Sequence, residues 1–395
     1  MMDDLPAGFR AGATSAAFKK IGRDDLGIIV SDRPCTYAGL FTTNLFKAAP
    51  VRVCEDILAS GSDIRAVIAN SGQANSCTGE EGARNCREIQ ELAASALGIK
   101  PSEILLLSTG VIGAQFDMAK WRKALPTLID SLGSRDAEGF TRAFMTTDAF
   151  PKFVTRVLNL SQGAIRLTVM AKGAGMICPN MATMLCVALT DAACERATWQ
   201  RLFTAAVNKS FNRVSVDGDT STNDSIIGLA NGASGVELAT QEDMDQFDAA
   251  LTDVLQRTAR MLVKDGEGAK RIMHIRVSGA ASDADAAKAA RAIGNSQLVK
   301  TAIYGGDANW GRIINAIGYS GAMANPAKTG LRLCGIERFR NGQPVNDELE
   351  PEISAAMTNA EIEIEVDLGS GLGSYELWAS DLGHEYVSLN SDYRS

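Results

Sequence analysis

Thr183 lies at the boundary between a glycine-containing segment, expected to be a flexible loop, and an apolar run. The segment AKGAGMICPNMATMLCVALTDA, residues 171–192, has Gly173 and Gly175 in its first half and a dense apolar run in its second half. Thr183 follows the small residue Ala182 at the boundary. Thr183 either hydrogen-bonds locally at a strand start, as threonine commonly does, or becomes a nucleophile after cleavage of the chain before it. Its own α-amine, with a pKa near about 8, would then be the base.

A second segment, LLLSTGVIG at residues 105–113, ends an apolar strand in small polar residues. Exposed backbone N–H groups and the hydroxyl of Thr109 could form an oxyanion hole for a tetrahedral intermediate. The alternative is a simple strand-to-turn transition, because turns favour the same residue types. The segment is therefore compatible with an oxyanion hole for acyl chemistry, but its residue types do not by themselves demand that role.

Three charged segments leave their roles open. Lys172 is either a surface lysine or a cation for a substrate carboxylate, and Glu267, between two glycines, either ends a solvated helix or serves a site. SVDGDTSTND at residues 215–224 resembles the start of a magnesium-dependent phosphatase of the haloacid dehalogenase type. That motif should follow a strongly apolar strand, but NKSFNRVS precedes it here.

The composition indicates a folded cytoplasmic protein. Apolar residues make up 46% of the 395 residues, and the N-terminus has no apolar segment typical of a signal peptide. A net charge of −8 without a Lys/Arg cluster argues against a nucleic-acid surface, and no apolar run is long enough for a membrane helix. Two histidines, His274 and His384, exclude a His-rich metal centre. The eight cysteines include no CxxC pair and indicate reduced thiols, most of them buried.

Strand-like and helix-like segments alternate along the chain, which predicts a mixed α/β protein with an antiparallel component. We expect strands at 26–32, 65–72, 103–110 and 165–171, the last half-buried because apolar and polar residues alternate. The C-terminal segment 362–381 predicts a hairpin with a Gly-rich turn.

Three amphipathic helices are expected to bury one face each. The third of them begins at an N-cap formed by Thr240 with Asp243. The expected buried faces are Ile89, Leu92, Ala93 and Leu97; Trp199, Leu202, Phe203, Ala206 and Val207; and Met244, Phe247, Leu251, Val254, Leu255 and Leu262.

Taken together, these segments and several others resemble the bacterial ornithine acetyltransferase family, also called glutamate N-acetyltransferase. The matching motifs, in the family's order, are LPAGFRAGA, VSDRPCTYAGLFTTNLFKAAPV, NSGQANSCTG, STGVIG, MTTDAFPK, KGAGMICPNMATML, VDGDTSTND, DGEGA, GGDANWGR and YVSLNSDYRS. They cover nearly the whole chain. The resemblance implies mixed sheets packed with helices in a layered αββα-like arrangement, with a smaller second lobe.

The resemblance further implies that the precursor cleaves itself between Ala182 and Thr183. An α-chain of residues 1–182 and a β-chain of residues 183–395 would form one intertwined unit, with Thr183 as nucleophile. Thr109 and Gly110 match the family's oxyanion pair. By the same matching, the substrate site comprises Thr146, Lys172, Thr183, Glu267, Asn390 and Ser395.

The implied reaction is ping-pong transfer of an acetyl group from N2-acetyl-L-ornithine to L-glutamate through acetyl-Thr183, in the cyclic pathway of arginine biosynthesis. No metal or other cofactor is needed, because one acetyl amide replaces another. The resemblance implies a dimer of αβ units and leaves open whether acetyl-CoA also serves as donor, giving N-acetylglutamate synthase activity.

Three positions depart from the family pattern. Cys178 stands where many relatives have histidine, Lys270 where relatives usually have threonine, and Ser395 where they end in threonine. Cys178 is interpreted as a small neutral substitute, and Lys270 as a residue that could alter side-chain specificity. The alternatives are an N-terminal-threonine amidohydrolase or aminopeptidase, a specialised acyltransferase on a related amino acid, and an inactive homologue acting as a binding protein.

Overall fold

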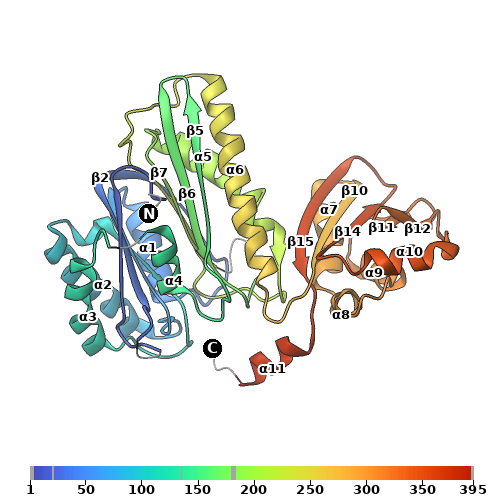
Figure 1. Ribbon diagram of the computed structural model, residues 1–395, viewed down its shortest axis with the longest axis horizontal. Coiled ribbons are helices and arrows are strands. Elements are labelled where there is room, and N and C mark those ends of the chain that lie inside the picture. The colour runs from blue at the N-terminus through green and yellow to red at the C-terminus, as the bar shows by residue number, and fades with distance from the viewer. Residues whose placement is uncertain (1–3, 20–21, 135, 179–183, 393–395) are drawn as a thin grey trace.

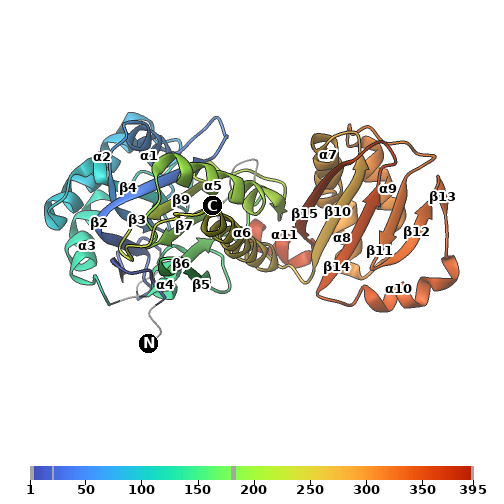
Figure 2. The same ribbon diagram turned by 90° about the horizontal axis from the view of Figure 1, so that it is seen from above.

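The computed structural model describes residues 4–19, 22–134, 136–178 and 184–392, arranged as a larger N-terminal lobe and a smaller C-terminal lobe (Figures 1 and 2). The larger lobe contains β1 (Phe9–Thr14), β2 (Leu26–Phe41), α1 (Ala49–Ala59), β3 (Ile64–Asn70), α2 (Gly79–Leu97), β4 (Ile104–Ser108), α3 (Met118–Asp130), α4 (Ala137–Phe144), β5 (Lys152–Leu160), β6 (Gly163–Lys172), β7 (Leu185–Thr190), α5 (Arg196–Asn208), β9 (Ser225–Ala230) and α6 (Gln241–Lys264). The smaller lobe contains β8 (Val214–Ser215), β10 (Ile272–Ala280), α7 (Asp283–Asn295), α8 (Gln297–Gly305), α9 (Trp310–Tyr319), β11 (Gly330–Leu333), β12 (Ile336–Arg340), β13 (Gln343–Pro344), α10 (Glu350–Ala356), β14 (Glu361–Asp367), β15 (Gly373–Ser380) and α11 (His384–Asp392).

The strands of the larger lobe form one eight-stranded sheet in the order β4-β3-β2-β9-β7-β6-β5, with β1 paired to β2, and the long strand β2 joins the two sheet layers. The first half of β2 pairs with β3, its second half pairs with β9, and the register shifts between Val30 and Cys35. Neighbouring residues of β3 face opposite ways: Ile68 packs with α2 and α3, whereas Val67 packs between the sheet layers with Val187. On the next layer, Ala188 faces α5 and α6. This order of helices, sheet, sheet and helices confirms the layered αββα arrangement.

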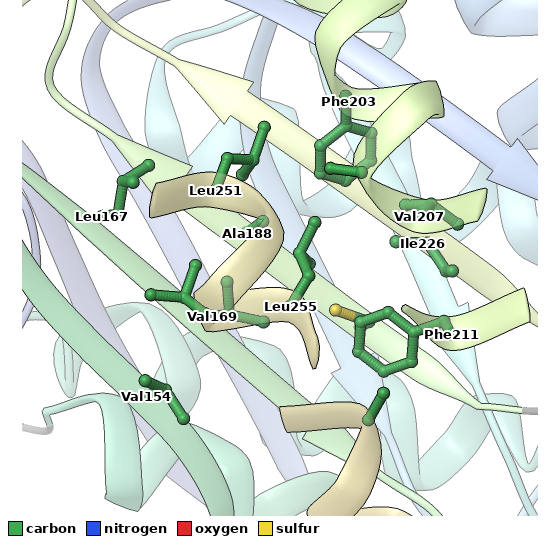
Figure 3. Close-up of a cluster of buried hydrophobic side chains, with 14 of the residues drawn as sticks. Val154, Leu167, Val169, Ala188, Phe203, Val207, Phe211, Ile226, Leu251 and Leu255 are labelled. Atoms are coloured by element: carbon green, nitrogen blue, oxygen red, sulfur yellow. The ribbon is translucent and has the colours of Figure 1, made fainter. Parts of the chain in front are cut away.

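The outer core of the second sheet layer lies under α5 and α6. Figure 3 shows Leu167, Val169, Ala188 and Ile226 of the strands meeting side chains of both helices, among them Leu251 of α6. Burying each large side chain contributes about 1.5–3 kcal/mol. The helix α6 begins, as expected, at a capping box of Thr240 and Asp243. Of the expected faces of α5 and α6, all residues are buried except Met244, which is partly exposed.

Two burial predictions in the larger lobe are wrong. The strand expected at residues 165–171 is β6, which is buried on both faces, because Met170 packs against the inner sheet layer while Val169 packs under α6. On α2, Leu92 is 39% exposed, and the buried face runs instead through Cys86, Ile89, Gln90 and Ala93. At about 100° per residue, Leu92 lies about 120° around the helix from the centre of this stripe and therefore faces solvent.

The smaller lobe has a seven-stranded sheet in the order β13-β12-β11-β14-β10-β15-β8. The predicted C-terminal hairpin is wrong, because β10 lies between β14 and β15, parallel to the first and antiparallel to the second. The Gly-rich turn crosses the end of β10, where Leu368 N–H donates to Ser278 O and Gly371 N–H donates to Gly279 O. A strand from earlier in the chain therefore occupies the place between the two that local sequence would pair directly.

Segments from both sides of the predicted cleavage site share one sheet. The strand β7 lies between β6 and β9, antiparallel to β6 and parallel to β9. In Figures 1 and 2, α6 runs between the larger lobe's sheet and the smaller lobe, and α11 leads the chain back toward the larger lobe. Across the described ranges, every helix is too short or too polar to cross a membrane.

Candidate active site

A pocket of about 200 Å³ opens at the edge where several strands begin or end. The strand register explains why the ends of β6, β7 and β9 lie together at this edge. Lys172 at the end of β6 pairs with Leu185 at the start of β7, which pairs in turn with Ser225 of β9. Six of the predicted site residues line this pocket: Thr109, Gly110, Thr146, Lys172, Glu267 and Asn390. Ala182, Thr183 and Ser395 lie outside the described residues, but Met184, which follows Thr183, lines the pocket as well.

The end of β4 offers one backbone donor and one hydroxyl to the pocket. The N–H of Thr109 is already used, because it donates to Asn70 O at 3.1 Å. The N–H of Gly110 has no acceptor within the described part of the chain, and Thr109 Oγ1 accepts from Lys172 Nζ at 3.3 Å. Since Lys172 donates to this oxygen, the hydroxyl proton of Thr109 is available for a ligand. An oxyanion would therefore meet Gly110 N–H and the Thr109 hydroxyl.

Only glycine fits at position 110. Its φ is +135°, a conformation that side chains disfavour. A Cβ atom there would lie 2.2 Å from the carbonyl carbon of Gly72 and 2.5 Å from the nitrogen of Gln73. The close approach of these two backbone segments sets the direction of the Gly110 N–H.

Lys172 is a buried cation with acidic neighbours. Burial lowers the pKa of its ammonium group, the nearby Lys152 lowers it further, and Asp148, Asp224 and Glu267 oppose the shift. Among the described residues that line the pocket, Lys172 is the only cation, whereas Asp217, Asp219, Asp224 and Glu267 are carboxylates. The pocket therefore suits a ligand with a carboxylate near Lys172 and a cationic group elsewhere.

A buried ion-pair cluster of Lys152, Asp148 and Asp265 lies near Lys172 and interacts with it electrostatically. Lys152 Nζ lies 2.7 Å from Asp148 Oδ1 and 2.5 Å from Asp265 Oδ2, and the side chains of all three are at most 4% exposed. Asp148 also accepts the N–H groups of Thr146 at 2.8 Å and Gly173 at 2.6 Å. Burial alone would raise the pKa of Asp148, but Lys172 and Lys152 hold it well below its usual range.

The sequence signal for this cluster is the motif TTDAFPK, although the predicted site includes neither Asp148 nor Lys152. Asp265 accepts the N–H of Ala149 at 3.0 Å and so joins the end of α6 to this loop. The cluster connects the segments that carry Thr146, Lys172 and Glu267.

Replacing Lys152 with methionine should lower the free energy of unfolding by about 3–5 kcal/mol, because two buried carboxylates lose their partner. Urea denaturation measures the change. Arg156→Met on the same strand is the matched control, since Arg156 pairs with Asp253 at 3.0 Å with both side chains more than 40% exposed. The control should lose no more than about 1 kcal/mol. Equal losses in the two variants would contradict this role for the cluster.

Glu267 is held at the pocket by the loop after α6 and by α11. Its N–H donates to Ala174 O at 3.0 Å, and Asn390 Nδ2 donates to its Oε2 at 2.7 Å. A Cβ atom at position 175 would lie 2.8 Å from the Glu267 carboxylate, so a side chain there would displace this carboxylate from its present place. The structure thus brings Glu267 and Asn390 together from elements 123 residues apart.

The loop 215–224 holds the segment that leads to the predicted cleavage site. Asp217 accepts the N–H groups of Met176 at 2.6 Å and Ile177 at 2.9 Å, and Met176 has a φ of +51°. Thr220 Oγ1 donates to Cys178 O at 3.1 Å. The Asp217 carboxylate is therefore occupied by backbone amides, which gives this aspartate a structural role in place of the phosphatase chemistry considered from sequence.

Two of the departures from the family pattern lie outside the pocket lining. Cys178 is buried, with Asn295 Nδ2 at 3.6 Å from its Sγ. Lys270 lies over the ring of Tyr304, with its Nζ 4.2 Å from the ring centroid. Neither side chain contributes to the pocket surface, so the expectation that Lys270 alters side-chain specificity directly has no support in this geometry.

Fold and site together define a layered αββα protein with a pocket that offers the Gly110 N–H, the Thr109 hydroxyl and the buried Lys172 to a ligand. The ArgJ family model matches residues 10–395. The chain belongs to the ArgJ family.

The chain matches curated relatives along its full length and solved structures along about half of it. The arginine biosynthesis bifunctional protein ArgJ of Nitratidesulfovibrio vulgaris is 55% identical and covers 100% of both chains. Among solved structures, the ArgJ protein from Bacillus halodurans is 40% identical over 51% of this chain and 96% of its own, with a TM-score of 0.49. The ornithine acetyltransferase from Mycobacterium tuberculosis, solved with ornithine, is 34% identical over 46% of this chain and 95% of its own, with a TM-score of 0.40.

Proposed function

We propose that this chain is an acyltransferase of arginine biosynthesis that moves an acetyl group from N2-acetyl-L-ornithine to L-glutamate. The observation that supports it best is the meeting of Gly110 N–H, the Thr109 hydroxyl and Lys172 at the pocket beside the start of β7. The pocket then combines an oxyanion site with a cation that can bind a carboxylate. The start of β7, two residues after Thr183, lies at the same pocket.

In the first half-reaction, Thr183 Oγ attacks the acetyl carbonyl of N2-acetyl-ornithine and its α-amine takes the hydroxyl proton. The negative charge that develops on the carbonyl oxygen is stabilised by Gly110 N–H and the Thr109 hydroxyl, and Lys172 polarises that hydroxyl. The amine returns the proton to the leaving nitrogen, so ornithine departs and acetyl-Thr183 remains. In the second half-reaction the amine of glutamate attacks the acetyl ester, and the same groups act in reverse.

The acid-rich lining favours ornithine over glutamate as the better-bound substrate. The side-chain ammonium of ornithine can pair with Glu267, which Asn390 holds at 2.7 Å, while one carboxylate pairs with Lys172. Glutamate carries a second carboxylate and has no cation for Glu267. The two half-reactions should therefore respond differently to a change at Glu267.

Replacing Glu267 with glutamine should raise KM for N2-acetyl-ornithine about ten-fold or more, because one charge-assisted contact is lost. The KM for glutamate should stay constant or fall, since repulsion of its side-chain carboxylate is relieved. Steady-state kinetics with each substrate varied in turn measures both constants. An equal rise in both KM values would contradict the assignment of Glu267 to the ornithine side chain.

The proposal includes self-cleavage between Ala182 and Thr183 into chains 1–182 and 183–395, and a cytoplasmic dimer of αβ units, which rest on the family resemblance. Use of acetyl-CoA as a second donor is tested by incubation with acetyl-CoA and glutamate alone. Mass spectrometry of denatured protein gives the chain boundaries, and light scattering gives the oligomer mass.

The deciding experiment supplies N2-acetyl-ornithine to pure protein with and without glutamate. With glutamate, N-acetylglutamate and ornithine should form in equal amounts; without it, release should stop after one equivalent of ornithine per site. Continuous release of acetate without glutamate would identify an amidohydrolase instead. No turnover and no acetylated Thr183 would overturn the proposal.

A further inference from the structure

A second cavity, of about 530 Å³, lies where the two lobes join. Its walls come from the last turns of α6, the start of β5, the start of β10 and the start of β14. Figure 1 shows these segments meeting at the lower end of α6, beside the smaller lobe. The volume falls within the range of small-molecule sites in proteins. None of the residues that line the active-site pocket lines this cavity.

The charged residues of this cavity are almost all cationic. Five cations line it, against the single carboxylate of Glu361. The five are Arg257, Arg260, Lys264, Lys270 and Arg271. The chain as a whole has a net charge of −8, so this concentration of positive charge runs against the average of the molecule. A cavity with such a lining attracts anions.

Pairing within the protein leaves much of this charge unbalanced. Glu361 pairs with Arg260 at 2.6 Å, and Arg257 lies 4.0 Å from Asp253, which Arg156 already approaches at 3.0 Å. Arg271 donates to two backbone carbonyls, while its buried Nε has no hydrogen-bond partner among the described atoms. Like charges that line one cavity repel one another, so a bound anion with several charges would relieve the repulsion.

The remaining walls are apolar. Phe153 and Val154 of β5, Met261 of α6 and Ile272 of β10 supply most of that surface. A ligand that fits both kinds of wall has two or more negative charges and a short carbon portion. Small organic phosphates and polycarboxylates share this chemistry.

One segment connects this cavity to the active-site pocket. Lys264 and Lys270 line the cavity, whereas Asp265 binds the buried Lys152 and Glu267 lines the active site. We propose that the cavity binds a small multivalent anion and that its occupancy stabilises residues 264–271. The ligand would bridge the two ends of this segment and fix the loop that presents Glu267.

Isothermal titration calorimetry with pyrophosphate, phenyl phosphate and citrate tests the site and separates phosphate from carboxylate ligands. The Arg257→Gln/Lys264→Gln double variant should bind the preferred probe about ten-fold more weakly or worse. The matched control is Lys123→Gln/Arg201→Gln, which removes the same charge from exposed positions on α3 and α5. No saturable binding of any probe to the native chain, or equal weakening in both double variants, overturns the proposal.

Hydrogen exchange supplies the second readout. Backbone amides of residues 264–271 should exchange more slowly when the preferred probe is added to the native chain or to the control variant. Unchanged exchange at saturating probe overturns the stabilisation of this segment. Both measurements report binding and not turnover, so their failure leaves the acyltransferase proposal intact.

Discussion

Replacing Thr183 with alanine should leave the chain as one piece of 395 residues and lower acetyl transfer by a factor on the order of 10⁴ or more. Two losses combine. The variant has no hydroxyl to attack either the preceding carbonyl or the substrate, and without cleavage the α-amine remains an amide that cannot accept a proton. A denaturing gel measures cleavage, and formation of N-acetylglutamate measures transfer.

Thr183→Ser is the informative control, because serine keeps the hydroxyl and loses only a methyl group. It should cleave and transfer acetyl groups at a reduced rate. Native rates of cleavage and transfer in Thr183→Ala would rule out this threonine as nucleophile. A variant that stays intact yet transfers normally would separate the two events and disprove the need for a free amine.

Replacing Gly110 with alanine should lower kcat by about 10²–10³, the usual cost of losing one oxyanion donor. The added Cβ atom would lie 2.2 Å from the backbone of Gly72, so the segment must move and its N–H turns away from the pocket. Because this contact forms in the transition state, kcat and kcat/KM should fall together. Steady-state kinetics gives both constants, and the gel shows whether cleavage slows as well.

Gly113→Ala separates the clash from backbone strain. Gly113 has a φ of +87°, like Gly110 in the left-handed range, but a Cβ atom there would meet nothing within 4 Å. Alanine at position 113 should cost about 1 kcal/mol of stability and leave kcat nearly unchanged. Equal falls of kcat in the two variants would show that strain in the loop, and not the Gly110 N–H, limits the rate.

Local patterns in the sequence were sufficient for the helices α2, α5 and α6 and for the class of fold. The capping box at Thr240 and the apolar stripe of α5 depend on residues three or four apart, so a short window contains the whole signal. The ordered motifs likewise predict Thr109, Gly110, Lys172 and Glu267 as site residues, and these four line one pocket.

The failed predictions share a cause. The segments β14 and β15 resemble a hairpin, and nothing within them reveals that β10, nearly ninety residues earlier, lies between them. The strand β6 alternates as a half-buried strand does, yet a second sheet layer covers its other face. In both cases a distant partner decides the outcome, and such partners leave no mark on local periodicity.

The sequence by itself thus determined which residue types could carry acyl chemistry, and it predicted three of the helices and several of the strands. Only the tertiary structure decided how those residues act together. It showed that Thr109 N–H is consumed by Asn70, which leaves the hydroxyl and Gly110 N–H as donors. It also showed the buried Lys152 cluster behind Lys172. Burial and hydrogen-bond partners depend on chain segments far apart in sequence, so they become defined only when the chain folds.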